Sequence, residues 1–226
     1  MIPVLGIPIL SRPDDLAAML ASVDEPVGRL VIVDNGGVVP DDFDWPGDFV
    51  VIDVGHNLGY AASVNLIVKA TPAAPWWCIA NADIVLAPGD LARIASQTAQ
   101  DGPRWVGIVD WRIYGLNAEC VATVGFWDEN FVPAFCEDAD YEYRCTLAGV
   151  PWTQLPGETS HARSVTLQES RYAEGNARSY PANRAYYRAK WGGYLRGGEQ
   201  FQTPFDQGGS VADWTLDIAR LRDLAW

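Results

Sequence analysis

Short apolar runs alternate with polar, glycine-rich turns over the first half of the chain. The runs predict strands over residues 2–9, 30–33, 49–54, 76–80 and 105–109. Segments of helical character lie between them; they begin at Ser11 to Asp15, at Gly59 and at Pro88 to Asp90, and they end near residues 22, 70 and 100. Because strands joined through helices by short connections form parallel sheets, the pattern predicts an α/β domain.

The pattern changes in the stretch GFWDENFVPAFCEDADYEYRCTLAG, which begins at Gly125. A helix is predicted over residues 137–147, and its first turn holds Glu137, Asp138 and Asp140. Acids in a first turn are stabilised by the helix dipole and by free backbone N–H groups, so ordinary helix capping explains them; the alternative is that they include a general base. Helical spacing predicts that Ala139, Tyr143 and Leu147 face the core. It also places Arg144 one turn after Asp140, where the two can form an i,i+4 pair.

The last part of the chain has a different composition. A short strand is expected near residues 151–155, and His161 follows it. Residues 164–226 are rich in Tyr, Trp, Arg and Gly, with helices predicted over 183–190 and 211–224 and a loop over 192–209. We therefore expect a main domain of residues 1–163 and a C-terminal extension of residues 164–226 packed on it.

Composition and charge narrow the class of protein. The chain has 226 residues, 49% of them hydrophobic and 20% charged, which are globular proportions. A formal net charge of −13 argues against a surface that follows the phosphates of DNA or RNA. The apolar start lacks a basic segment and contains prolines, so it is predicted to be a strand and not a signal peptide or membrane anchor. The four cysteines form no CxxC pair, as expected for reduced thiols in a cytoplasmic protein.

Polar clusters follow three of the predicted strands: Asp34-Asn35, Asn57 with Gly59, and Asn81-Ala82-Asp83. Each cluster taken alone is also a plausible turn. In an open parallel sheet, however, ligands bind beyond the carboxyl ends of the strands, and all three clusters lie there. The sequence contains neither a P-loop nor the dinucleotide-binding fingerprint, so an enzyme that uses nicotinamide or flavin is not expected.

Five motifs in order carry a resemblance to a known family: VIVDNGG, GHNLGYAASVN, IANADIVL, the stretch from Gly125 to Gly149, and SHARS. Together they resemble the GT-A fold glycosyltransferases of family 2, in particular the rhamnosyltransferase-like branch, over about residues 2–163. The tail ANRAYYRAKWGG is similar to that of such chains. The resemblance implies a single GT-A domain, a Rossmann-like α/β fold of nucleotide-diphospho-sugar transferases, with a mostly parallel central sheet and a C-terminal helical and loop extension.

The resemblance also implies roles for individual residues. A nucleotide-sugar donor would be bound by Pro8, Ser11, Arg12, Asp34, Asn57, Gly59, Asn65, Asn81, Ala82, Asp83, Gly125 and Trp127. Asn65 would support the loop at 57–59, and Trp127 would contact the sugar. Asp83 would hold Mn²⁺ or Mg²⁺, with His161 as a second ligand or, alternatively, as an ordinary solvated side chain. Asn81 replaces an acid of the family motif, which removes one charge from the metal site.

The two acids of the ED motif would carry the chemistry. Asp138 would be the general base that takes the proton of an acceptor hydroxyl, with Glu137 and Asp140 orienting it or the acceptor. A sugar would pass with inversion from a UDP- or dTDP-linked donor to a glycan, lipid-linked glycan, protein or modified base. Two alternatives stay open: a non-catalytic sugar-nucleotide or glycan binding module, and a nucleotidyltransferase. The aromatic extension could also pack against a second copy of the chain.

Overall fold

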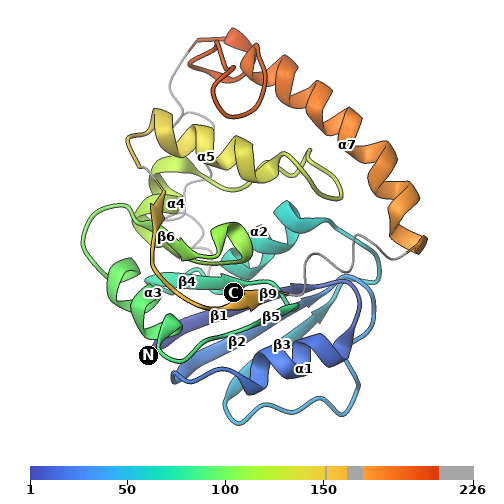
Figure 1. Cartoon of the computed structure of the whole chain (residues 1–226), viewed down its shortest axis with the longest axis vertical. Coiled ribbons are helices and arrows are strands. Elements are labelled where there is room, and N and C mark those ends of the chain that lie inside the picture. The colour runs from blue at the N-terminus through green and yellow to red at the C-terminus, as the bar shows by residue number, and fades with distance from the viewer. Residues whose placement is uncertain (151, 162–169, 209–226) are drawn as a thin grey trace.

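The structure is a computed structural model, and it describes residues 1–150, 152–161 and 170–208. A seven-stranded sheet forms its centre, in the order β3-β2-β1-β4-β7-β6-β8 (Figure 1). Its strands are β1 (Ile2–Ile9), β2 (Val27–Asp34), β3 (Asp48–Asp53), β4 (Trp76–Ala80), β6 (Trp105–Ile108), β7 (Ile113–Asn117) and β8 (Thr153–Gln154). A separate pair joins β5 (Ile84–Val85) to β9 (Ser160–His161).

The sheet is mostly parallel, as the sequence predicts. β1 pairs in parallel with both β2 and β4, and β2 pairs in parallel with β3. The register sets Ile9 opposite Asp34 and Asp34 opposite Asp53, so these strands end at one edge of the sheet. β7 is the exception, because it runs antiparallel to β4 and to β6. The predicted α/β fold with a mostly parallel central sheet is confirmed.

Helices cover both faces of this sheet (Figure 1). On one face, α1 (Pro13–Ala21) and α3 (Asp90–Thr98) pack through side chains such as Met19 and Ile94. On the other face lie α2 (Tyr60–Ala70), α4 (Ala118–Val124) and α5 (Glu137–Leu147), whose core includes Trp77, Trp105 and Tyr141. The burial of large apolar side chains on both faces explains the continuous apolar strands of the sequence.

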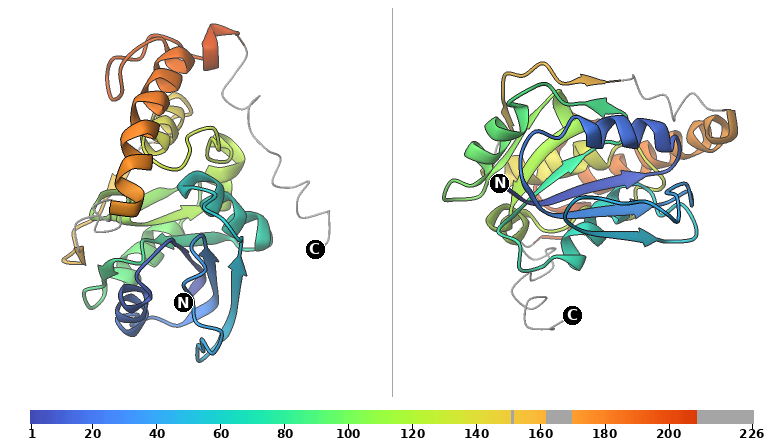
Figure 2. Two further views of the ribbon diagram at one scale, coloured as in Figure 1. Left: turned by 90° about the vertical axis from the view of Figure 1, so that its right-hand side faces the viewer. Right: turned by 90° about the horizontal axis from the view of Figure 1, so that it is seen from below.

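A third apolar cluster joins α5 to the long helix α7 (Ser170–Trp191), which runs along the outer side of the molecule (Figure 2). Tyr187 and Trp191 of α7 are fully buried in it beside Phe131. The spacing of Ala139, Tyr143 and Leu147 predicts a core-facing side for α5, and these residues do contact apolar partners, but in this cluster with α7. The side of α5 toward the sheet carries Tyr141 and Cys145 instead.

Several predicted elements have other bounds in the structure. β2 extends at both ends beyond residues 30–33, and α7 begins 13 residues before the predicted start at residue 183 and passes through Pro181. The short 3₁₀ helices η1 (Asp110–Arg112) and η2 (Pro204–Asp206), as well as β7 and α4, were not predicted. The helix predicted over 211–224 lies outside the described residues. Among the residues that the structure describes, no helix is long and apolar enough to cross a membrane.

Candidate functional site

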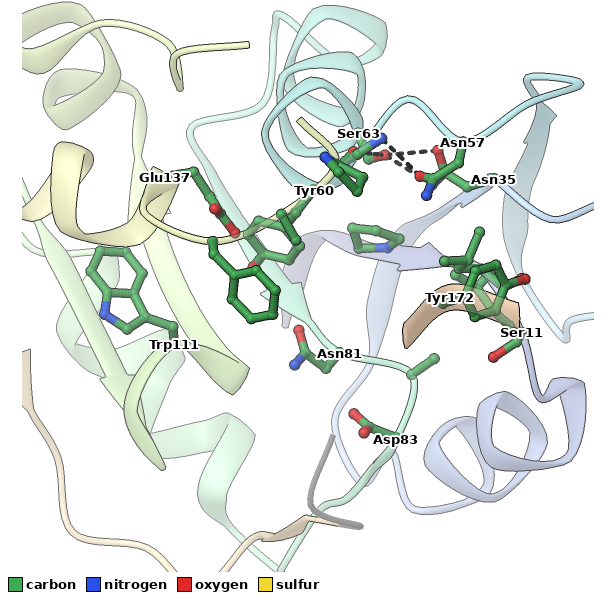
Figure 3. A pocket seen from close by; sticks show the side chains of 18 of the residues that line it. Ser11, Asn35, Asn57, Tyr60, Ser63, Asn81, Asp83, Trp111, Glu137 and Tyr172 are labelled. Atoms are coloured by element: carbon green, nitrogen blue, oxygen red, sulfur yellow. Dashed lines mark hydrogen bonds between the residues drawn. The ribbon is translucent and has the colours of Figure 1, made fainter. Parts of the chain in front are cut away.

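A cavity of about 490 Å³ opens at the carboxyl edge of the sheet (Figure 3). It has the size of pockets that bind small molecules and cofactors. Residues that follow β1, β2 and β4 line it together with the start of α2, the start of α5 and η1. Of the predicted site residues, those that line it are Pro8, Ser11, Asn57, Gly59, Asn81, Ala82, Asp83, Glu137 and Asp138. Asn35 lines it too, so the three strand-end clusters of the sequence each contribute to one cavity.

The turn after β2 contributes Asn35 and not the predicted Asp34. Both oxygens of the buried Asp34 carboxylate accept hydrogen bonds from their own loop, from the N–H of Gly36 at 3.0 Å and of Val39 at 2.7 Å. Asn35 lines the cavity, and its side chain donates to Ser63 Oγ and accepts from the N–H of Leu58 (Figure 3). Asp34 thus shapes the loop, while Asn35 joins it to the start of α2.

Gly59 lies where the loop before α2 meets the segment before α5. Its φ is +84°, and a Cβ at this position would come within 2.5 Å of the carbonyl oxygen of Pro133. The next residue, Tyr60, donates its backbone N–H to that same oxygen at 2.9 Å. Only glycine adopts this backbone conformation and permits this approach at low cost. The contact brings Pro133 and Phe135 to the cavity opposite the strand ends.

Asn65, predicted to support the loop at 57–59, instead supports the segment after Gly125. Its side chain accepts from the N–H of Trp127 and donates to the carbonyl oxygen of the same residue, both at 2.9 Å. It also donates to Glu129. Arg12 does not line the cavity either, and it forms an ion pair with Asp15.

Asp83 follows β4 and lines the cavity between the end at Trp111 and the end at Ser11 (Figure 3). The residue after it, Ile84, is the antiparallel partner of His161 in the β5–β9 pair. The backbone of His161 therefore lies beside the residue that follows Asp83, although the two are far apart in sequence. Among the described residues, no group of three or more His, Cys, Asp or Glu side chains could hold a metal without other ligands.

Glu137 is buried at the left end of the cavity as Figure 3 shows it. Burial, and secondarily the charge of Asp138, raises its pKa from 4.5 to about 8. Its Oε2 atom has no hydrogen-bond partner among the described residues. A carboxyl group in this state is protonated at neutral pH, so it can donate a hydrogen bond to an oxygen atom in the cavity.

Asp138 has a different environment from its neighbour. Its side chain is 36% exposed, and its Oδ2 atom accepts from Nη2 of Arg196 at 3.1 Å. Arg196 belongs to the segment after α7 and also pairs with Glu142. Asp140, in contrast, is fully buried away from the cavity, where Arg144 and Lys190 pair with it. The expected pair of Asp140 and Arg144 is present, and Asp140 is placed to support α5, not to contact a ligand.

Trp127 is the residue for which the predicted contact and the observed position differ most. It is 4% exposed, stacks on Tyr141 with ring centroids 4.5 Å apart, and does not line the cavity; neither does Gly125. Trp111 lines the cavity instead (Figure 3). Trp105, which is buried in the core, contacts the rings of both Trp111 and Tyr141.

Four further residues of the cavity were not expected from the sequence. Trp111 and Arg112 come from η1, and Tyr172 and Gly175 come from the first turns of α7. The Tyr172 hydroxyl donates to the carbonyl oxygen of Leu10 at 3.3 Å, which joins the C-terminal extension to the end of β1. Trp111 and Arg112 lie in a short turn without a periodic pattern, and Tyr172 and Gly175 reach the cavity through a contact that is distant in sequence, so no local signal indicated them.

The mostly parallel sheet with helices on both faces has the GT-A architecture. Solved structures with this fold include S. aureus TarS residues 1–349, with a TM-score of 0.53 and 12% identity over 69% of this chain and 58% of that chain. Another is glucosyl-3-phosphoglycerate synthase from Mycobacterium tuberculosis, solved with Mn²⁺, UDP and glucosyl-3-phosphoglycerate; its TM-score is 0.52 and its identity 13%, over 79% of this chain and 80% of that chain. At these identities the likeness shows the fold alone.

One curated protein is similar in sequence, the galactofuranosyl glycosyltransferase of Leishmania donovani. It is 28% identical, over 49% of this chain and 31% of its own length. The matched part of the chain thus spans about a third of the length of that relative. No protein-family model matches the chain.

Proposed function

We propose that the chain is an inverting, metal-dependent glycosyltransferase, which transfers a sugar from a nucleoside diphosphate donor to a hydroxyl group of an acceptor. The observation that carries this proposal is that Asn57, Asp83 and Asp138, from three separate parts of the chain, line one cavity. The GT-A fold and the similarity to a galactofuranosyl glycosyltransferase support sugar transfer. The finer assignment to family 2 and to its rhamnosyltransferase-like branch rests on the sequence motifs.

The cavity has two ends suited to two substrates (Figure 3). Ser11, Asn35 and Asn57 lie at one end, where the strands of the N-terminal half finish, and they suit the nucleoside of a UDP- or dTDP-linked donor. Glu137 and Trp111 lie at the other end, and they suit the acceptor. Asp83 lies between the ends, where the diphosphate of the donor would come.

The residues present fit a hard divalent cation, since Asp83 offers a carboxylate at this central position and the backbone of His161 lies beside the next residue. Asp83 would hold Mn²⁺ or Mg²⁺, with His161 as a second ligand and Asn81 beside it. The bound ion would act as a Lewis acid that stabilises the charge of the diphosphate leaving group. The M. tuberculosis synthase was solved with Mn²⁺ and UDP, which supports a divalent cation and a nucleoside diphosphate as the molecules bound here.

Proton transfer is assigned to Asp138. Its carboxylate would take the proton of the acceptor hydroxyl while the oxygen forms a bond to C1 of the sugar and the bond from C1 to the diphosphate oxygen breaks. Arg196 fixes one carboxylate oxygen of Asp138 at 3.1 Å. Glu137 would donate a hydrogen bond to the acceptor or the sugar from its protonated carboxyl group.

In this proposal the extension from residue 164 onward completes the active site through Tyr172 and Arg196. The protein works in the cytoplasm, where its free cysteines stay reduced.

Release of nucleoside diphosphate from a panel of UDP- and dTDP-sugars, with Mn²⁺ present and water as the acceptor, tests this function. We expect one donor to be hydrolysed by the wild type and at least about 100-fold more slowly by Asp138→Asn, the usual cost of losing a general base. Asp14→Asn, an exposed change on α1, is the control and should hydrolyse the donor normally. Donor binding without turnover in the wild type would favour the non-catalytic binding module.

A further inference from the structure

Arg112 is the one basic residue among the described residues that line the cavity. The titratable acids that line the same cavity are Asp15, Asp83, Glu137 and Asp138. The whole chain carries a net charge of −13. An anionic molecule that enters this cavity is therefore repelled by the carboxylates of Asp15, Asp83 and Asp138, and Arg112 is the side chain placed to attract it.

The guanidinium group of Arg112 is available for such a molecule. Arg112 is half-buried, and none of the described residues forms a hydrogen bond or an ion pair with its side chain. Lys190 of α7 and Arg196 after it differ in this respect, since Lys190 pairs with Asp128 and Asp140, and Arg196 pairs with Asp138. A half-buried cation at a cavity, without a protein partner in the described part of the chain, has the features of a residue that binds a ligand.

The backbone around Arg112 holds it firmly at this position. The carbonyl oxygen of Arg112 accepts the N–H of Asn81 at 2.8 Å, so η1 is attached to the motif that includes Asp83. Just before it, Val109 and Asp110 adopt φ angles of 54° and 55°, in the left-handed region that a β-branched residue such as valine adopts only at a cost. Strained turns of this kind persist where the surrounding structure determines them, and they are frequent at ligand sites.

The position of η1 decides which substrate Arg112 contacts. This step rests on the function proposed above. Trp111 of η1 and Glu137 lie at the end of the cavity away from Ser11 and Asn57 (Figure 3). If the donor nucleoside occupies the end at Ser11 and Asn57, the Trp111 end receives the acceptor.

We propose that Arg112 is a specificity-determining residue that binds an anionic group, a carboxylate or a phosphate, on the acceptor. The planar guanidinium can donate two parallel hydrogen bonds to either group, and a charged partner makes these bonds stronger than neutral ones. Trp111, next to Arg112 in η1, offers its ring to the apolar face of the acceptor. The enzyme then selects an acceptor that is negatively charged and carries a free hydroxyl group within reach of Asp138.

The test compares three sugars that differ in charge: glucose, glucuronate and glucose 6-phosphate. Their dissociation constants for the full chain are measured by calorimetry without a nucleotide present. We expect at least one of the two anionic sugars to bind about 10-fold more tightly than glucose, the usual effect of a hydrogen bond to a charged group. Arg112→Gln should abolish this difference. Arg112→Lys keeps the positive charge but loses the planar guanidinium with its two parallel donors, so it should show an intermediate preference for the anionic sugars. It replaces the glutamine variant if that variant does not fold.

Arg104→Gln is the matched control, because Arg104 precedes β6 at the opposite end of the strand pair that η1 connects, and it is half-buried like Arg112. It should keep the full preference for the anionic sugars. Equal affinity for all three sugars in the wild type, or a preference that survives in Arg112→Gln, would overturn the proposal. So would weaker UDP binding by Arg112→Gln with sugar binding unchanged, since Arg112 would then contact the donor. A wild type that binds no nucleotide but prefers anionic sugars would reject the proposed transfer and leave the subsite standing.

Discussion

The ammonium group of Lys190 on α7 lies 2.6 Å from the carboxylate of Asp140 on α5 and 2.7 Å from that of Asp128. Asp140 is fully buried, and it also accepts hydrogen bonds from Arg144 at 2.9 Å and from Trp191 Nε1 at 2.8 Å. This network joins the C-terminal extension to the helix that begins with Glu137 and Asp138. The position of the candidate catalytic acids therefore depends on contacts that lie outside the cavity.

Lys190→Met is expected to destabilise the protein by about 3 kcal/mol, because removing one partner of a buried ion pair leaves a charge without compensation. Urea unfolding at pH 7 measures the change in the free energy of unfolding. The control is Arg178→Met, which breaks an exposed pair with Glu174 on the same helix and should cost less than about 1 kcal/mol. Equal losses for the two variants would mean that the network does not stabilise the contact between α5 and α7.

The raised pKa of Glu137 predicts a dependence of stability on pH. In the folded protein this carboxyl group keeps its proton up to about pH 8, whereas the unfolded chain releases it near pH 4.5. The folded state thus binds more protons between these values, and its stability relative to the unfolded state falls as pH rises from about 4.5 to about 8.

Glu137→Gln removes the titrating group and should lose less stability than the wild type over that range. Urea unfolding of both proteins at pH 5, 6.5 and 8 gives the two profiles. Asp14→Asn, at an exposed carboxyl on α1, is the control and should follow the wild type. Parallel profiles for wild type and Glu137→Gln would show that Glu137 is already ionised at pH 7.

The two neighbouring tryptophans should respond differently to substitution. Trp127→Ala leaves a hole in the core beside Tyr141 and is expected to cost about 3–5 kcal/mol of stability. Trp111→Ala removes a ring at the cavity, so a smaller loss of stability and weaker binding of a sugar ligand are expected. Thermal melting and sugar binding, measured on both variants, separate the two roles. A Trp111→Ala variant that is as unstable as Trp127→Ala and binds sugar normally would reverse this assignment.

The first half of the fold could be predicted because its signals are local. Buried parallel strands require continuous apolar runs, and the turns at their ends require residues such as Gly59 and Asn81. The antiparallel β7 and its turn η1 gave no such signal, since the turn holds Val109 and Asp110 in a left-handed conformation without glycine. Likewise, Pro181 and a mostly polar composition concealed the length of α7, whose burial depends on contacts with α5 that are distant in sequence.

Within the candidate site, residue type could be predicted more readily than orientation. The turn after β2 was correctly placed at the cavity, but the side chain that reaches it is Asn35, because Asp34 is engaged by its own loop. The aromatic motif near residue 127 was placed beside the sugar, yet its tryptophan packs inward and Trp111 lines the cavity. Which neighbour turns inward is decided by tertiary packing, which one sequence does not display.

The proposed function requires that the cavity bind a nucleoside diphosphate together with a divalent cation at Asp83. Thermal melting with a panel of nucleoside diphosphates, with and without Mn²⁺, tests this claim in wild type and in Asp83→Ala, because a ligand that binds the folded state raises the melting temperature. We predict a rise with one nucleotide that requires Mn²⁺ and is lost in the variant. A melting temperature that no nucleotide changes, or a rise that Asp83→Ala keeps in full, would show that this cavity is not a metal-dependent donor site.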